Sequence, residues 1–402
     1  MSRRRIESIL VKVFAMNNWK KIKVSDIGRI ITGKTPKTAE KDNYGGDIPF
    51  LTPSDDLSEK YVYKTIKNIT EKGMNSVKGA IIPASSVCVS CIGSDLGKVV
   101  ITTKQIVTNQ QINSIVVNKD LFDTDFVYYS MLVLGRFLNY HSKTSTAVPI
   151  INKSTFSNYE INCPDLKTQR KIGNILACLD SKIDANKQIN DNLLQQASAL
   201  YKSYFIDMLP FNGIMPSNWH VGTVSEITTL HDSKRIPLSG RERANLAKIY
   251  PYYGATSIMD YVDKYLFDGI YLLLGEDGSV IDDKGFPILQ YVDGKFWVNN
   301  HAHIITGKNG FSVEMLYLLF SLTNVQSIVT GAVQPKISQS NLNKVNVVIP
   351  SQEDCIKFDS VVQPFFAQIR NLRTENSKLS ELRDSLLPRL MSGEFDVSDI
   401  DI

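Results

Sequence analysis

The chain carries one sequence pattern twice. Residues 19–27 read W-K-K-I-K-V-S-D-I, and residues 219–227 read W-H-V-G-T-V-S-E-I. Further matching segments follow in the same order: 48–50 with 250–252, 108–113 with 298–303, 147–151 with 333–337, and Pro164 with Pro350. A repeat of this length predicts two copies of one domain rather than a solenoid of short units. The offset drifts from 200 (Trp19 to Trp219) to 186 (Pro164 to Pro350), so loops vary on a shared framework. Binding chemistry commonly lies on such loops, which makes recognition the expected role.

A long helical pattern follows each copy. Residues 166–205 contain no proline and one glycine, and apolar residues recur at steps of three and four, the spacing of a coiled-coil seam. The same seam reappears after Pro350, where Pro364 is expected to bend the helix or delay its start. The predicted seam positions are Ile172, Leu176, Leu179, Ile183, Asn190, Leu193, Leu200, Phe365, Ile369, Leu372, Asn376, Leu379 and Leu386.

These two helices are expected to pack on each other in antiparallel fashion, with Asn190 and Asn376 fixing the register. The alternative is that each helix packs on its own globular domain or pairs between chains. The predicted fold class is therefore α+β: two duplicated α/β domains joined by two long antiparallel helices, a coiled-coil spacer with pseudo-two-fold symmetry.

The predicted organisation has six segments: an N-terminal extension (1–18), a first domain (19–164), a first helix (165–207), a second domain (208–350), a second helix (351–395) and a tail (396–402). A net charge of +4 does not by itself indicate nucleic-acid binding, so a local basic patch would have to supply it. No apolar run approaches the roughly 18 residues that span a bilayer. The five cysteines are scattered and odd in number, which predicts no disulfide framework and a reducing cytoplasm.

Specific motifs now add to this pattern. In order, they are T-G-K-T-P (32–36), Y-G-G-D-I-P-F-L-T-P (44–53), T-N-Q-Q-I-N (108–113), A-L-Y-K-S-Y-F (199–205), N-N-H-A-H (299–303) and L-R-D-S-L-L-P-R-L-M-S-G-E-F (382–395). Together they resemble the specificity subunit of type I restriction–modification enzymes, and the resemblance extends from Trp19 to Phe395. Two features depart from it: S-Q-E-D-C-I after Pro350 predicts a less regular helix start, and residues 1–18 have no counterpart in the second half.

The resemblance implies two target recognition domains, each reading half of a bipartite double-stranded DNA site. The helices would set the gap between the half-sites and dock two modification (methyltransferase) subunits, and restriction/translocase subunits would join that core. S-adenosylmethionine, ATP and Mg²⁺ are expected on those partners, with no cofactor and no catalytic residue in this chain. No membrane partner is expected.

The sequence contains neither a dinucleotide-binding G-x-G-x-x-G after a strand nor a Walker A motif, which agrees with a non-catalytic role. His301 and His303 would share one face if residues 296–305 form a strand. Three roles are considered for these two histidines: metal ligands, a structural polar pair, or DNA contacts. Zinc would need further ligands that the sequence does not identify, so no metal site is predicted.

Candidate DNA contacts are the Lys, Arg, Asn, Gln and His side chains that suit phosphates and base edges. They are Lys34, Lys37, Asn109, Gln110, Gln111, Lys143 and Thr144 in the first copy, and Lys234, Arg235, Arg241, Arg243, Asn299, His301, Gln334 and Lys336 in the second. Asn109 and Asn299 have an alternative role in capping the backbone, since both copies keep them. The divergent segments 34–72 and 234–264 are the better candidates for specificity.

Two other functional hypotheses stay open at this point. One is a specificity-type subunit of another restriction system, or a stand-alone DNA-binding regulator. The other is a zinc- or nucleotide-dependent enzyme with duplicated domains.

Overall fold

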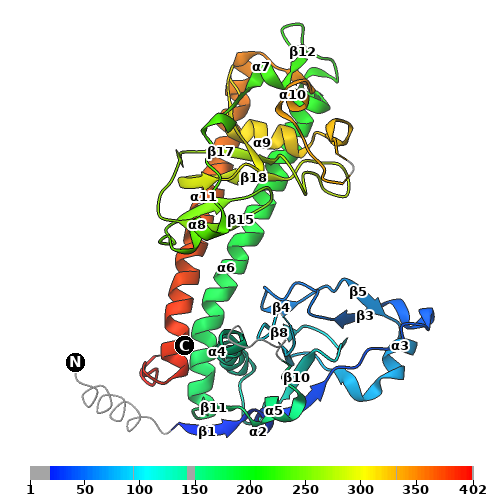
Figure 1. Ribbon diagram of the computed structural model, residues 1–402, viewed down its shortest axis with the longest axis vertical. Helices are drawn as coiled ribbons and strands as arrows, with labels where there is room; N and C mark the ends of the chain where they lie inside the picture. The colour runs from blue at the N-terminus through cyan, green and yellow to red at the C-terminus, as the bar shows by residue number, and fades with distance from the viewer. Residues whose placement is uncertain (1–18, 94, 143–149, 332, 401–402) are drawn as a thin grey trace. The chain divides into compact units, whose positions relative to one another are not determined.

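The computed structural model describes residues 19–93, 95–142, 150–331 and 333–400 (Figure 1). The chain divides into two units: residues 1–183 with 377–402 form unit 1, and residues 184–376 form unit 2. Both divisions fall inside long helices, α6 (Leu166–Tyr201) and α11 (Gln352–Met391), so each unit holds one globular region and part of each helix. The predicted extension 1–18 lies outside the described residues.

Unit 1 is built around two mixed sheets and a strand pair. The larger sheet has the order β2-β10-β7-β8-β4, formed by Gly28–Thr32, Ile112–Val117, Val87–Ser90, Val99–Thr102 and Tyr61–Val62. The smaller sheet has the order β5-β3-β9-β6, formed by Lys67–Ile69, Tyr44–Leu51, Ile106–Thr108 and Ile81–Ile82. In the strand pair, β1 (Lys20–Lys23) runs antiparallel to β11 (Glu160–Cys163).

Unit 2 repeats this topology except that its larger sheet has no counterpart of β4. The order β13-β20-β17-β18 comprises Thr228–Leu230, Ala302–Gly307, Tyr271–Gly275 and Leu289–Val292. The order β15-β14-β19-β16 comprises Ile258–Val262, Tyr250–Tyr253, Lys295–Val298 and Phe267–Asp268. A strand pair, β12 (His220–Thr223) with β21 (Asn346–Ile349), completes it. The duplication predicted from the sequence is therefore confirmed in the order of the paired strands.

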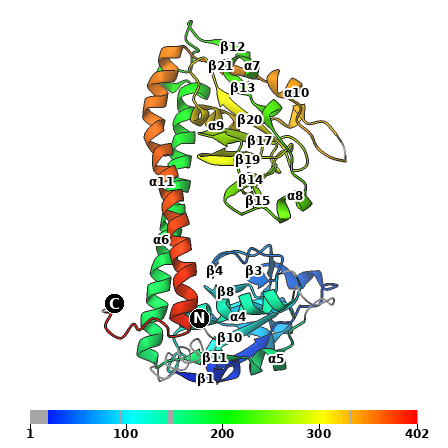
Figure 2. The same cartoon turned by 60° about the vertical axis from the view of Figure 1, so that its left-hand side comes forward.

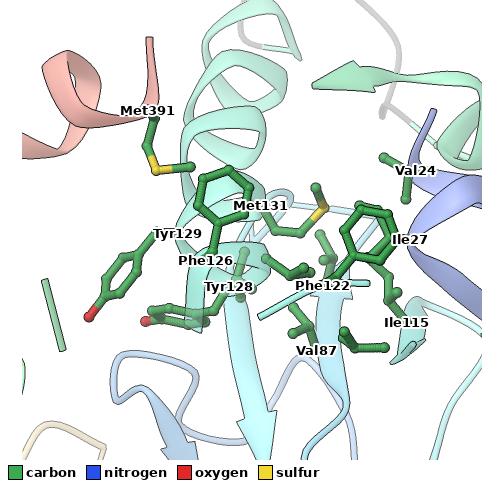
Figure 3. Close-up of a cluster of buried hydrophobic side chains, with 14 of the residues drawn as sticks. Val24, Ile27, Val87, Ile115, Phe122, Phe126, Tyr128, Tyr129, Met131 and Met391 are labelled. Atoms are coloured by element: carbon green, nitrogen blue, oxygen red, sulfur yellow. The ribbon is translucent and has the colours of Figure 1, made fainter. Parts of the chain in front are cut away.

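The core of unit 1 joins its larger sheet to the long helices. Figure 3 shows Phe126 and Met131 of α4 (Thr124–Ser142) gathered with Val87 and Ile115 of the sheet and Met391 of α11. Helix α4 begins where the Asp123 carboxylate accepts the backbone N–H of Phe126 at 2.9 Å, a side-chain N-cap. Ile172, Leu176, Leu387 and Leu390 extend the same core from α6 and α11. The long helices thus pack on the globular region as well as on each other.

In unit 2, α9 (Val313–Ser321) takes the place of α4 over the larger sheet. The Ser312 hydroxyl caps it by accepting the N–H of Met315 at 3.1 Å. Its core includes Phe320, Phe358 and Phe366, and Ala197, Tyr201 and Phe205 contribute from α6 and the turn of π-helix after it. Within the described residues, no helix combines the length and apolar character needed to cross a lipid bilayer.

The antiparallel helix pairing is confirmed within each unit. In unit 2, Asn186 faces Asn376 at 2.8 Å between Nδ2 and Oδ1, and Tyr204 faces Phe358 with ring centroids 5.9 Å apart. Residue numbers thus rise along α6 as they fall along α11. In unit 1, Arg383 Nη1 lies 2.8 Å from Asp180 Oδ1.

Most predicted seam residues are buried or half-buried, but the seam shifts at three positions. Leu200 is exposed, and its neighbour Tyr201 is buried instead. On α11, Phe366 and Leu387 are fully buried where Phe365 and Leu386 were expected, and these two are half-buried. The reason is that these helix segments pack against globular cores as well as against a partner helix, so a strict two-helix heptad does not describe them.

The expectation of a delayed second helix is wrong. Helix α11 begins at Gln352 and continues through Pro364. The Ser351 hydroxyl accepts the N–H of Asp354 at 3.2 Å, just as Asp165 accepts the N–H of Thr168 at 3.1 Å at the start of α6. A serine cap supplies a regular helix start that the sequence comparison between the two copies did not indicate.

Candidate nucleic-acid interface

Loops meet at one end of the larger sheet in unit 2. The N–H of Glu276 donates to the carbonyl of His301, the N–H of Ile337 donates to that of Glu276, and the N–H of Gly278 donates to that of Pro335, at 2.8, 2.8 and 2.9 Å. Residues 333–336 lie on the side of unit 2 away from α6 and α11 (Figure 2). This loop cluster brings together Lys234, Arg235, Asn299, His301, Gln334 and Lys336, most of the second-copy candidates.

A buried ionic network holds these loops. Asp232 Oδ2 lies 2.6 Å from Nδ1 of His303, and Glu276 Oε2 lies 2.5 Å from Nη1 of Arg235. Arg235 also donates to the carbonyl of Ala302 at 2.8 Å, and Lys336 approaches Glu276 at 3.3 Å. Because the network joins the 232–235 segment, Glu276, the start of β20 and Lys336, it fixes these segments relative to one another.

His303 is fully buried between two acceptors. Its Nδ1 faces the Asp232 carboxylate, and its Nε2 lies 2.8 Å from the carbonyl of Ile337. Both ring nitrogens must therefore donate, as only an imidazolium can. Residues 296–305 do not form one strand, because a turn separates β19 from β20, so His301 and His303 belong to different environments. For His303 the structure favours the structural polar interpretation.

The carboxylates of Asp232 and Glu276 stay ionised because of their hydrogen-bond and ion-pair partners. Burial alone would raise the pKa of Asp232, but hydrogen bonds from His303 and Gln339 outweigh it and lower the pKa below its ordinary value. Burial likewise opposes ionisation of Glu276, and Arg235, His303 and Lys336 together lower its pKa.

Asp232, Glu276 and His303 also lie close enough together to be considered as metal ligands. Potential ligand atoms of Asp232, Glu276 and His303 lie within 4.8 Å of one another. However, both ring nitrogens of His303 donate, and both carboxylates already bond to cationic side chains. A metal would need a lone pair from His303 and would sit beside the Arg235 guanidinium. The residues therefore fit an ion-pair network and not a metal centre.

Unit 1 builds the same position from uncharged groups. Sheet register places Thr32 opposite Asn113 as it would place Asp232 opposite His303, and the Thr32 hydroxyl donates to Asn113 Oδ1 at 2.6 Å. The Asn113 amide donates to Cys91 Sγ at 3.2 Å and to the carbonyl of Ile151 at 3.4 Å. Cys91 and Ile151 thus match Glu276 and Ile337 of unit 2. Burial raises the pKa of the Cys91 thiol to about 11, so it stays neutral.

Both copies close the turn between the two central strands in the same way. The Asn109 carboxamide accepts the N–H of Gln111 at 3.1 Å, and that of Asn299 accepts the N–H of His301 at 2.8 Å. These are Asx turns, in which the side chain replaces a backbone acceptor. The capping role considered for both asparagines is thus seen in the structure.

The remaining candidates differ in exposure. Lys34, Gln110, Lys234 and Gln334 are exposed, and Lys37 lies 3.5 Å from Glu40. Arg243 bonds Asp260 at 2.8 Å and lies over the Tyr252 ring, so its guanidinium is already engaged within the domain. Arg241 is exposed on α8 (Gly240–Ala244). Lys143 and Thr144 lie outside the described residues.

Sequence reasoning missed Asp232, Glu276, Asp277 and the role of Asn113. A signal was present, since aligning the copies pairs Thr32 with Asp232 and Asn113 with His303. Paired substitutions at two distant positions indicate contact between them. No sequence pattern, however, places Glu276 beside Arg235.

The fold and site define a class: a protein with two copies of one domain, each presenting a loop cluster of different chemistry on a common framework. The model of the type I restriction modification DNA specificity domain matches residues 16–195 and 216–381. The chain therefore belongs to the family of type I restriction–modification DNA specificity subunits.

Individual relatives agree with this assignment. The chain is 28% identical to the MjaIX specificity subunit of Methanocaldococcus jannaschii over 95% of both chains. It is 35% identical to the HindI specificity subunit of Haemophilus influenzae over 179 residues, covering 43% of this chain and 39% of the relative. Its fold resembles the crystal structure of the S subunit from M. genitalium, with a TM-score of 0.54, 16% identity, and coverage of 94% and 96% of the two chains.

Proposed function

We propose that each unit reads one half of a bipartite double-stranded DNA site through its loop cluster, and that the chain itself carries out no catalysis. The observation that carries this proposal is the matched loop cluster: corresponding strands in the same order and the same turn geometry, with a neutral network in unit 1 and a charged one in unit 2. A shared scaffold with different polar chemistry suits the reading of two different half-sites.

Phosphate contacts would come from exposed cations beside each cluster. Lys34 in unit 1 and Lys234 in unit 2 occupy matching positions and are exposed. Such contacts position a protein on the duplex without reading its sequence. The polar side chains of the turns and of the 330–336 loop are then left to read base edges.

The paired helices would set the separation of the half-sites and dock two modification subunits. In unit 2 their surfaces expose Ile189, Ile356 and Val361, and in unit 1 they expose Leu382. Exposed apolar side chains on an otherwise polar helix surface suit a protein partner. S-adenosylmethionine chemistry would belong to those modification subunits, and ATP-dependent chemistry to restriction subunits that join them.

Exchange of the two globular regions tests this proposal. A chain with residues 19–164 and 219–350 interchanged is co-expressed with its modification subunits, and methylated sites are mapped by single-molecule sequencing. The two half-sites should exchange places in the methylated motif. A motif that keeps its original order in a soluble, assembled complex would contradict the assignment of one half-site to each unit.

A further inference from the structure

Gln111 and His301 occupy the same place in the two loop clusters. Each is the second residue after the turn asparagine, which accepts its N–H. The carbonyl of each accepts a hydrogen bond of 2.8 Å, from the N–H of Cys91 in unit 1 and of Glu276 in unit 2. The backbone is thus held on both sides, and both side chains are half-buried, with 42% of the His301 side chain exposed. These two positions share a rigid backbone and differ in side-chain chemistry.

The hydrogen-bond network fixes the orientation of the Gln111 amide. The backbone N–H of Gln111 can only donate, so Asn109 must turn Oδ1 toward it and Nδ2 away. Nδ2 of Asn109 then donates to Oε1 of Gln111 at 2.8 Å. With its oxygen engaged, Gln111 presents its amino group, for which no partner is found among the described residues.

The His301 ring is oriented by a different partner. The Asp277 carboxylate bonds to its Nδ1, and because a carboxylate accepts, Nδ1 must carry the proton. The nitrogen left to face outward is Nε2, which in the neutral ring is an acceptor. The two copies therefore present opposite hydrogen-bonding character at one structural position.

We infer that Gln111 and His301 are specificity-determining residues, each reading one base in the half-site of its own unit; the inference rests on the proposed function. The Gln111 amino group matches base-edge acceptors, such as guanine O6 and N7 or thymine O4. Nε2 of neutral His301 matches the exocyclic amino groups of adenine N6 or cytosine N4. Asn109 and Asp277 are positioning residues that set which group is presented.

The test changes the group that each position presents. Gln111→Glu keeps an oxygen for Asn109 but presents an acceptor, and His301→Leu removes the acceptor nitrogen. Each variant is co-expressed with the modification subunits, and the methylated motif is mapped by single-molecule sequencing. We expect the preference at one base of one half-site to change by about tenfold or more, while the other half-site and the spacing are unchanged. The matched controls Lys119→Ala and Lys308→Ala, which alter exposed residues just beyond the opposite ends of β10 and β20, should leave the motif unchanged.

Asp277 supplies a second, independent measurement. Asp277→Ala frees the His301 ring and should relax the preference at the same base that His301→Leu affects. Asp277→Asn keeps an acceptor for Nδ1–H and should restore it, with an unchanged Tm in both variants. Variants with an unchanged motif, or a loss of methylation that follows only a fall in Tm and is not rescued by Asp277→Asn, would overturn the inference. A wild-type protein that directs no bipartite motif would instead overturn the proposed function.

Discussion

Arg235 joins several parts of the loop cluster in unit 2. It bonds Glu276, the carbonyl of Ala302 and the carbonyl of its own neighbour Asp232, and 14% of its side chain is exposed. The sequence marks Arg235 as a basic residue near Lys234 and gives no sign that the two act differently. The structure separates them: Lys234 faces solvent, and Arg235 compensates buried carboxylates.

Replacing Arg235 with alanine should therefore destabilise unit 2. The substitution removes the guanidinium that lies 2.5 Å from Glu276, and breaking a largely buried ion pair from one side costs about 3–5 kcal/mol. Urea unfolding should show this loss of free energy. The matched variant Lys234→Ala should leave the stability unchanged and weaken DNA binding at all sequences alike, reducing the salt dependence by about one ion. Equal stability of the two variants would show that the network is not structural.

Acid should unfold unit 2 before unit 1. The pKa values of Asp232 and Glu276 are lowered in the folded protein, so their stabilisation is present above the unfolded pKa, near 4, and is lost as the pH falls below it. The matching positions Thr32, Asn113 and Cys91 carry no carboxylate. Fluorescence of a variant keeping only Trp297 should change at higher pH than that of a variant keeping only Trp19. Coincident transitions would contradict the prediction.

At the scale of elements, the helix pair shows what a pattern can and cannot predict. Heptad spacing predicts two long antiparallel helices and most of their buried residues, because that periodicity follows directly from helix geometry. The heptad pattern fails at Leu200, Phe365 and Leu386. There the helices also pack against a globular core, and the more buried residues are their neighbours Tyr201, Phe366 and Leu387. The core residues that make these contacts are distant in sequence from the helices, so the heptad pattern does not predict them.

The two buried asparagines of α6 should respond differently to substitution. Asn186 donates to Glu375 and Asn376 at 2.8 Å each, whereas no side-chain hydrogen bond of Asn190 is found among the described residues; Oδ1 is buried without a partner in both asparagines. Asn190→Leu should therefore raise the free energy of unfolding by about 1 kcal/mol, since an unsatisfied polar group is removed. Asn186→Leu should lower it by about 1–3 kcal/mol, because its partners lose their donor. Urea unfolding of both variants checks the difference in sign; the same sign for both would contradict it.

At the scale of the whole molecule, duplication was readable in the sequence because the framework residues of the two copies stayed similar. The candidate DNA contacts were predicted less well, because the sequence does not show whether a basic residue is paired with a carboxylate in the folded protein. The network partners Asp232 and Glu276 are 44 residues apart and meet only through sheet register. The structure therefore supplies the division between side chains that hold the loops and side chains that face outward.

The helices give a prediction at this scale. Removing one heptad from each helix at facing positions should shorten the unread spacer of the DNA site and leave both half-sites unchanged, if the helices set the distance. Methylated-motif mapping with the assembled complex measures this directly. An unchanged spacer length would rule out the proposed role of the helices.

The most direct test of the central claim is a methylome of a host that supplies active modification subunits, recorded by single-molecule sequencing with and without this gene. The account predicts one bipartite, adenine-methylated motif that is present with the gene and absent without it. Identical methylomes, despite assembly of this chain with the modification subunits, would contradict it.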